Sequence, residues 1–192
     1  MEAREYIQRG PLDEQDDLWN NESIGSKERV LIDSQGYRLN VGIIVCNNND
    51  QLLLCRRFGK PRAWQFPQGG IDKHEQPRDA MYRELVEELG LAPTDVCYMA
   101  ETVDWLTYVL PKAYRRYRSK PLCIGQKQKW FLLRLVSADD AIRLDTSVEQ
   151  EFDQWRWVEY WDPIEQVIEF KREVYQQVLA EFAPLLSKSE QP

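Results

Sequence analysis

The 192-residue sequence contains one histidine, His74, and only four cysteines. A catalytic triad with a histidine base, or a zinc site with several histidine ligands, is therefore poorly supported. We expect His74, which comes just before a helical pattern, to be an exposed loop residue. The cysteines are far apart and form no C-x-x-C pair: Cys46, Cys55, Cys97 and Cys123. This usage is typical of a reduced, cytosolic protein, and we expect the thiols to be buried.

Long apolar runs and a surplus of basic residues are also absent. No run approaches the roughly 18 apolar residues that a membrane-spanning helix needs, and the acidic N-terminus lacks the apolar segment of a signal peptide. The chain carries 25 basic and 32 acidic residues, a net charge of −7. A general nucleic-acid coat or a protein that binds anionic membranes would carry a basic surplus, so the composition argues against both classes. A local basic patch is still compatible with it.

The length and the 43% hydrophobic content are those of one domain with a sizeable core. Residues 1–30 differ from the rest, because they hold eight acidic and four basic residues and show little periodicity. We predict a poorly ordered extension over residues 1–30, a single domain over residues 31–186 and a short flexible tail over residues 187–192.

The stretch from Gly69 to Leu91, GGIDKHEQPRDAMYRELVEELGL, organises the chain. Pro77 is expected at the first helical position, where its missing N–H costs nothing, and Gly90 is expected to end the helix in the left-handed conformation. Between them, residues 78–89 contain strong helix formers and no glycine or proline.

Three glutamates on that helix, Glu84, Glu87 and Glu88, stand at positions i, i+3 and i+4, so their carboxylates share one face and repel one another. A hard divalent cation such as Mg²⁺ would offset that repulsion. The opposite face carries Met81, Leu85 and Leu89 and is predicted to pack on the core. From the three glutamates alone, a solvated acidic helix is the simpler interpretation.

Strand patterns surround this helix. YRLNVGIIVC and QLLLCRRF, joined by the turn NNND, predict a hairpin, and the tail after Asp162 predicts a helix in two pieces. This order predicts an α/β fold with a mixed sheet between helices. The remaining expected strands cover residues 64–67, 96–102, 104–110, 129–136 and 154–161.

A basic segment lies between two of these strands. Residues 112–129 contain seven basic and no acidic residues, with Tyr114 and Tyr117 among them. Aromatic rings stack on bases and cations meet phosphates, so the mixture suits single-stranded nucleic acid. A solvated basic loop explains the same pattern equally well.

The residues Gly69, Glu75, Arg83–Leu85, Glu87–Glu88 and Gly90–Leu91 together resemble the signature of the Nudix hydrolases. Four further segments resemble the bacterial RNA pyrophosphohydrolase subgroup, also described as dinucleoside polyphosphate hydrolases: WQFPQGGI, GQKQKWFLL, EFDQWRW and FKREVY. The resemblance extends from Ile32 to Phe182. It implies the Nudix fold, a mixed β-sheet sandwiched between α-helices (α/β/α).

The resemblance also implies an activity: removal of pyrophosphate from the 5′-triphosphate or diphosphate end of RNA, leaving a monophosphate and promoting mRNA decay. It implies two or three Mg²⁺ or Mn²⁺ ions, which neutralise phosphate oxygens and activate water while a glutamate takes its proton. Such an enzyme needs no membrane and acts in the cytoplasm. Two alternatives remain, a hydrolase of dinucleoside polyphosphates and a non-catalytic nucleotide-binding module.

Individual residues take their expected roles from the same resemblance. The catalytic, metal-binding glutamates are Glu84, Glu87 and Glu88, joined at the metal by Glu151 and a main-chain carbonyl near Gly69. Which glutamate is the base stays open, because ligand and base glutamates look alike.

Structural roles in the motif fall to Gly70, Gly90 and a Glu75–Arg83 pair that orients the helix. Substrate binding is expected at Arg38, Arg57, Lys127, Lys129 and Phe170, with Arg57 and Phe170 sandwiching a base near the RNA 5′ end. From the pattern alone, Phe170 would be a core residue.

Shorter members of the subgroup begin with methionine where Leu31 stands. We therefore hypothesise that translation starts at Leu31 and that residues 1–30 are absent from the native protein. A peptide from residues 5–25 in mass spectra of the native protein would contradict this.

Overall fold

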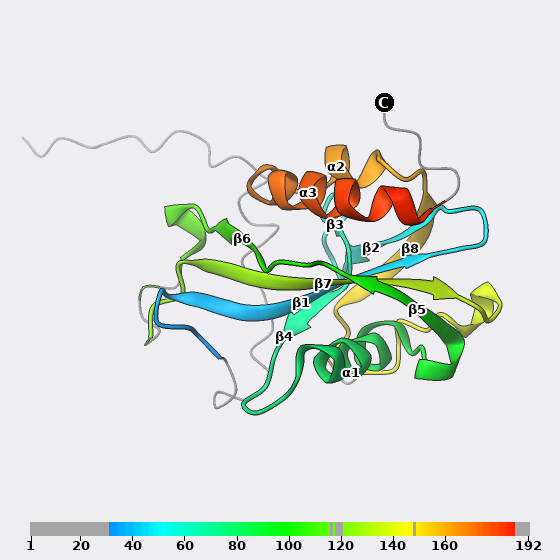
Figure 1. The fold of residues 1–192 in the computed structure, drawn as a ribbon, viewed down its shortest axis with the longest axis horizontal. Helices are drawn as coiled ribbons and strands as arrows, with labels where there is room; N and C mark the ends of the chain where they lie inside the picture. The colour runs from blue at the N-terminus through cyan, green and yellow to red at the C-terminus, as the bar shows by residue number, and fades with distance from the viewer. Residues whose placement is uncertain (1–30, 116, 118–120, 148, 187–192) are drawn as a thin grey trace, which may run out of the picture.

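The computed structural model describes residues 31–115, 117, 121–147 and 149–186. A mixed sheet lies between one long helix on one face and two helices on the other, which is the predicted α/β/α sandwich (Figure 1). The helices are α1 (Pro77–Leu89), α2 (Asp162–Gln166) and α3 (Arg172–Phe182). The strands are β1 (Tyr37–Cys46), β2 (Leu52–Arg57), β3 (Trp64–Gln65), β4 (Gln68–Gly70), β5 (Val96–Glu101), β6 (Leu106–Val109), β7 (Gly125–Leu135) and β8 (Phe152–Val158).

Strand β1 is the centre of the sheet. It pairs in parallel with β7 along its whole length, and β4 pairs antiparallel on its other side, where Val41 lies opposite Gly69. The predicted hairpin forms, but β1 meets β2 only at its end, where Cys46 lies opposite Leu52. Strand β2 then turns away to pair with β3 and β8. The space left beside β1 admits β4, which carries the glycine pair to α1.

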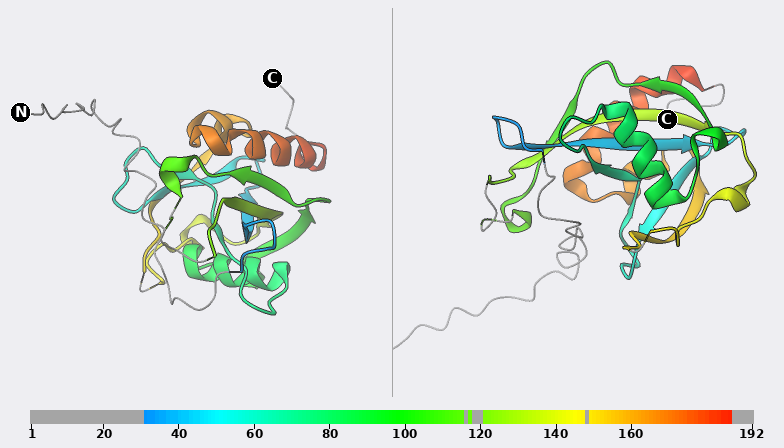
Figure 2. Two further views of the ribbon diagram at one scale, coloured as in Figure 1. Left: turned by 90° about the vertical axis from the view of Figure 1, so that its left-hand side faces the viewer. Right: turned by 90° about the horizontal axis from the view of Figure 1, so that it is seen from below.

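The two faces of the sheet carry two separate cores. The views in Figure 2 show the helices on either side of the sheet. Val41, Ile43 and Phe131 face α1, which contributes Met81 and Leu85. Residues that alternate with them face α2 and α3, because side chains on a strand point to opposite faces in turn. The predicted apolar face of the helix is confirmed, since Met81, Leu85 and Leu89 are all fully buried.

On the α3 face, Trp130 lies over Gly42, where an added Cβ would come 2.4 Å from the indole ring. The helical tail forms in two pieces, as predicted, and α3 buries Val174, Tyr175 and Val178. The ring of Phe66 stacks on Tyr175 at 4.8 Å between centroids. These aromatic contacts fix the segment that leads into β4.

Several expectations about single residues can now be compared with the structure. His74 is exposed, as predicted. The prediction of buried thiols is wrong for two cysteines: Cys46 and Cys55 are buried, but Cys97 is exposed and Cys123 is half-buried. Cys97 lies on β5, an outer strand of the sheet, and it alternates with Val96 and Tyr98, which join the core on the α1 side. The predicted extension (1–30) and tail (187–192) lie outside the described residues.

No helix among the described residues is long and apolar enough to cross a membrane.

Candidate metal-binding active site

Helix α1 begins and ends where its sequence predicts. Pro77 occupies the first turn, and Gly90 follows the last one with φ of 67°, donating its N–H to the Val86 carbonyl. Gln76 precedes the helix in an extended conformation and makes no side-chain capping bond. The helix therefore depends on its proline start, its glycine stop and its tertiary contacts rather than on a side-chain N-cap.

The segment after β7 closes the C-terminal end of α1. Arg143 donates its main-chain N–H to the Leu89 carbonyl at 2.7 Å, and the Thr146 hydroxyl lies 3.3 Å from the carbonyl oxygens of Val86 and Glu87. The Glu87 and Leu89 carbonyls belong to the last turn, which has no donors of its own for them, so the segment supplies partners, and at Val86 it adds to the N–H of Gly90. The sequence predicts only a polar loop here, because no local pattern shows which distant groups it will contact.

Arg83 connects the parts of the site. Its Nε lies 2.9 Å from Glu75 Oε1, its Nη1 lies 2.6 Å from Glu84 Oε1, and its Nη2 donates to the Gly70 carbonyl at 2.8 Å. Glu87 is a more distant partner, at 3.4 Å. The hydrogen bond from Arg83 lowers the pKa of Glu75. The structure thus brings Glu75 and Arg83 together as predicted, and it extends the pair to the glycine segment and to Glu84.

Gly69 lies directly against the carboxyl group of Glu84. An added Cβ at Gly69 would fall 1.7 Å from Glu84 Cδ, closer than any two non-bonded atoms can come. Only glycine allows this approach of the main chain to the helix. The neighbouring Gln68 donates its main-chain N–H to Glu88 Oε2 at 3.0 Å. Strand β4 therefore contacts two of the three predicted glutamates through main-chain atoms.

The carboxyl groups of Glu84 and Glu88 are buried, whereas Glu87 is exposed. Burial raises the pKa of Glu84 to about 7, against the opposing effect of the Arg83 charge. Burial raises the pKa of Glu88 well above its usual range, and the charge and hydrogen bonding of Glu151 add to this. Glu151, which the sequence places far from the motif, thus lies beside Glu88 as predicted.

The donor chemistry of this cluster fits a hard divalent cation. Carboxylates and a main-chain carbonyl are the oxygen ligands that Mg²⁺ and Mn²⁺ prefer. Burial and the mutual repulsion of the carboxylates raise the two pKa values, and a bound cation would offset both effects. Within the described part of the chain, no three acidic, histidine or cysteine side chains converge in a ready-made cluster. The Glu84 carboxylate instead turns to Arg83, which a cation would have to displace in part.

The predicted phosphate-binding lysines project from β7 on the α1 face of the sheet. Lys127 Nζ lies 3.8 Å from Asp33 Oδ2. Lys129 Nζ donates to the carbonyl oxygens of Thr102 and, at 3.1 Å, Val103. Lys129 on β7 lies opposite Val41 on β1, and Val41 lies opposite Gly69 on β4. The lysine is therefore two strands away from Gly69, which contacts Glu84.

Phe170 and Arg38 lie near the other face of the sheet. Phe170 is partly buried, with its ring 5.2 Å from that of Tyr114 and 5.7 Å from that of Tyr108. An added Cβ at Gly70 would come 2.7 Å from Arg38 Nη2, so the guanidinium lies over that glycine. Arg57 is 5% exposed at the end of β2. The Tyr114 contact links Phe170 to the basic segment.

A buried polar group that the sequence does not reveal lies beside Phe170. Lys171 is 3% exposed, and its Nζ lies 3.2 Å from Gln68 Oε1 and 3.3 Å from Gln65 Oε1. Gln128 also reaches Gln68 Oε1, at 3.3 Å. From periodicity alone Lys171 would be placed at the surface. The alternating glutamines of β7, Gln126 and Gln128, are the sequence signal for a polar group in this core.

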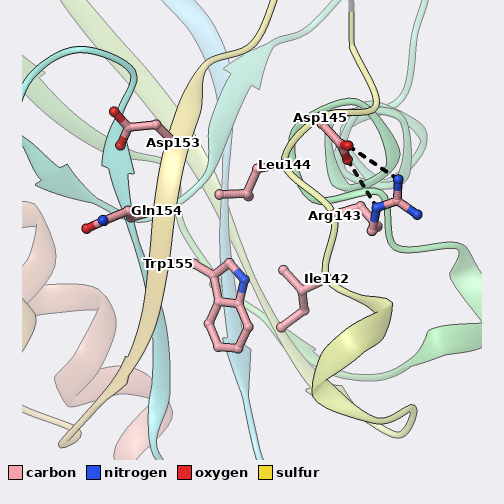
Figure 3. Close-up of a pocket in the computed structure, with 7 residues that line it drawn as sticks. All are labelled: Ile142, Arg143, Leu144, Asp145, Asp153, Gln154 and Trp155. Carbon is pink, nitrogen blue, oxygen red and sulfur yellow. Dashed lines mark hydrogen bonds and ion pairs between the residues drawn. The ribbon is translucent and has the colours of Figure 1, made fainter.

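A cleft of about 470 Å³ lies between the segment after β7 and strand β8 (Figure 3). None of the predicted glutamates lines it. Its carboxylates already have cationic partners, since Asp145 pairs with Arg143 at 3.1 Å and Asp153 pairs with Arg56 at 2.7 Å. We therefore assign the chemistry to the carboxylate cluster and not to this cleft.

Comparison with known proteins identifies the family. The family model described as NUDIX domain matches residues 36–178. The chain belongs to the Nudix family. It is 57% identical over 154 residues to an RNA pyrophosphohydrolase of Shewanella piezotolerans, a match that covers 80% of this chain and 88% of that protein. It is 56% identical over 156 residues to the RNA pyrophosphohydrolase of Salmonella arizonae, covering 81% and 88%. Both the family and the subgroup predicted from the sequence are confirmed.

Solved structures confirm the Nudix fold. The C. elegans Ap4A hydrolase binary complex matches with a TM-score of 0.55 at 20% identity, covering 76% of this chain and 98% of that one. The E. coli dihydroneopterin triphosphate pyrophosphohydrolase matches with a TM-score of 0.57 at 16% identity, covering 74% and 95%.

The raised pKa values predict how the stability of the metal-free protein depends on pH. Glu84 binds a proton up to about pH 7 in the folded state but only to about pH 4.5 when unfolded. Between these values the folded state holds more protons, so the free energy of unfolding falls as pH rises, by on the order of 3 kcal/mol for Glu84. Carboxylates with lowered pKa values add no slope there, because they are already ionised in both states.

We therefore expect the melting temperature in a chelator to fall between pH 5 and pH 8. The Glu84→Gln variant should show a shallower fall. A melting temperature that rises over this range would contradict the assignment.

Proposed function

We propose that this Nudix protein is an RNA 5′-pyrophosphohydrolase of the bacterial cytoplasm. It removes pyrophosphate from the 5′-triphosphate or diphosphate end of RNA and leaves a 5′-monophosphate, which promotes mRNA decay. The observation that carries the proposal is that a chain 56–57% identical to RNA pyrophosphohydrolases over four-fifths of its length buries Glu84 and Glu88 on one helix, with Glu151 beside Glu88.

The residues that would hold the cations are Glu84, Glu87, Glu88, Glu151 and the main-chain carbonyl of Gly69. When bound, two or three Mg²⁺ or Mn²⁺ ions neutralise phosphate oxygens and make water more acidic. Glu84 and Glu88 supply their ligand oxygens from a buried position, which the main chain of β4 fixes by direct contact. Their orientation is therefore set before substrate binds.

The protein's own side chains position the reaction. Arg83 holds Glu84 against the glycine segment and is itself held by Glu75, so this pair orients the helix and does not touch the reacting phosphorus. One of the three helix glutamates accepts the proton of the attacking water at a carboxylate oxygen. The hydroxide then attacks phosphorus in line with the leaving group.

Substrate binding is proposed at the residues that surround the cluster. Lys127 and Lys129 lie on the same face of the sheet as α1 and would attract the triphosphate. Arg38, beside Gly70, would meet phosphate near the first nucleotides. Phe170 offers a partly buried ring beside Tyr114, and with Arg57 it would enclose a base of the RNA 5′ end.

One assay on the purified protein tests the substrate. With Mg²⁺, we expect release of pyrophosphate from 5′-triphosphorylated RNA and a 5′-monophosphorylated product. Cleavage of diadenosine tetraphosphate is measured in parallel. Fast turnover of the dinucleotide with no action on short RNA would contradict the proposal and favour the dinucleoside polyphosphate alternative.

A pair of variants tests the proposed metal-binding glutamates. We expect Glu84→Gln to lower kcat at least about 100-fold, because it removes a buried ligand charge. The matched control is Glu165→Gln, at an exposed glutamate in α2, which should leave kcat unchanged. Full activity of Glu84→Gln would show that the catalytic assignment is wrong, and a protein with no hydrolase activity at all would favour the non-catalytic module.

A further inference from the structure

The loop between β2 and β3 presents an aromatic ring to solvent next to the carboxylate cluster. Phe58 is 57% exposed, whereas its neighbour Arg57 is only 5% exposed, so the chain turns one side chain inward and the next outward. Single exposed apolar residues are normal on protein surfaces, so exposure alone assigns no role. Phe58 differs from such residues in the hydrogen bonds that hold its main chain and in the charged residues near it.

The loop is held in one conformation by its own main chain. Arg57 donates its N–H to the Ala63 carbonyl at 2.9 Å. Two further main-chain bonds of 3.0 Å close the turn: Lys60 donates to the Arg57 carbonyl, and Ala63 donates to the Lys60 carbonyl. Gly59 has φ of 69° and donates to Asp153 Oδ2 at 3.0 Å. A ring on such a loop loses little conformational freedom when a ligand stacks on it.

The same loop is joined to the catalytic cluster. The main-chain N–H of Phe58 donates to the Glu151 carbonyl at 2.8 Å. The Glu151 carboxyl interacts in turn with Glu88. Phe58 is therefore one hydrogen bond away from a residue that would hold the cation, so this loop borders the proposed metal site.

The charge of the loop matches that occupant. The segment from Phe58 to Ala63, FGKPRA, contains Lys60 and the exposed Arg62 and no acidic residue. An exposed aromatic ring with cations beside it is the combination that binds single-stranded nucleic acid, through base stacking and phosphate contacts. An apolar protein partner would leave the two cations without a role.

We propose that Phe58 is the stacking platform for a nucleobase of the RNA substrate, with Lys60 and Arg62 contacting its phosphates. This site rests on the proposed function, and it is separate from the pair Arg57 and Phe170. The hydrogen bonds that hold the loop come from the protein itself, so the loop keeps this conformation whether or not substrate is present.

Steady-state kinetics on 5′-triphosphorylated RNA tests the platform. Base stacking on an aromatic side chain is worth about 1–3 kcal/mol, so Phe58→Ala should raise KM roughly 5- to 150-fold with kcat little changed. Phe58→Tyr, which keeps the ring, should restore the KM. The matched control Val136→Ala removes an exposed apolar side chain at the far end of β7 and should change neither constant.

Stacking has its own spectroscopic signature. RNA that carries 2-aminopurine near its 5′ end should lose fluorescence on binding Glu84→Gln protein, which binds without turnover, and should lose much less on binding the Glu84→Gln, Phe58→Ala double variant. Equal quenching by the single and double variants, with an unchanged KM for Phe58→Ala, would overturn the platform. In that case, activity of the wild-type protein on RNA would leave the proposed function standing. Loss of wild-type activity on RNA would instead reject the proposed function.

Discussion

The burial of two carboxyl groups, Glu84 and Glu88, between α1 and β4 is the constraint on which the rest of the site depends. Burying an unpaired charge is costly, so the surrounding groups must supply compensation. Arg83 supplies part of it for Glu84, and the main-chain N–H of Gln68 supplies part for Glu88. Burial, together with repulsion from Glu87 and Glu151, remains partly uncompensated and appears in the raised pKa values, and it would favour the binding of a cation.

The same burial explains local features of the fold. Gly69 must be glycine because the Glu84 carboxyl occupies the place of a side chain. Strand β4 reaches this position because β2 leaves β1 after one paired position and opens a place beside it. The segment after β7 closes the end of α1 through Arg143 and Thr146 and then continues to Glu151. One stretch of chain thus sets both the end of the catalytic helix and its distant acidic partner.

Gln68 joins the two faces of the sheet. Its main-chain N–H contacts Glu88 on the α1 face, and its side chain accepts a hydrogen bond from Lys171 on the α3 face. Phe170, next to Lys171, belongs to the proposed base site. The groups proposed to bind RNA and those proposed to bind metal are therefore connected through a single residue of β4, which gives the short strand its importance.

Sequence reasoning predicts much of this architecture, because its strongest signals are local. The limits of α1 and its apolar face follow from spacing within one helix, and the Glu75–Arg83 pair follows from the resemblance to the Nudix signature; the structure shows each of them. Contacts between distant segments could not be predicted from periodicity. The capping bonds of Thr146, the buried Lys171 and the attachment of Phe58 to Glu151 depend on how strands cross in space. The burial of Cys97 was predicted wrongly for the same reason, since no pattern in the sequence shows that β5 is an outer strand of the sheet.

The central claim is that the buried carboxylates form a cation site, and the thermal shift on adding Mn²⁺ at pH 7.5 tests it most directly. A ligand at about 100 times its Kd stabilises the folded state by about 2.7 kcal/mol, which for a domain of this size is a shift of roughly 5–10 °C. We expect that shift in the wild type and in Glu165→Gln, and its loss in Glu88→Gln. Equal shifts in all three proteins would place the cation elsewhere and contradict the account.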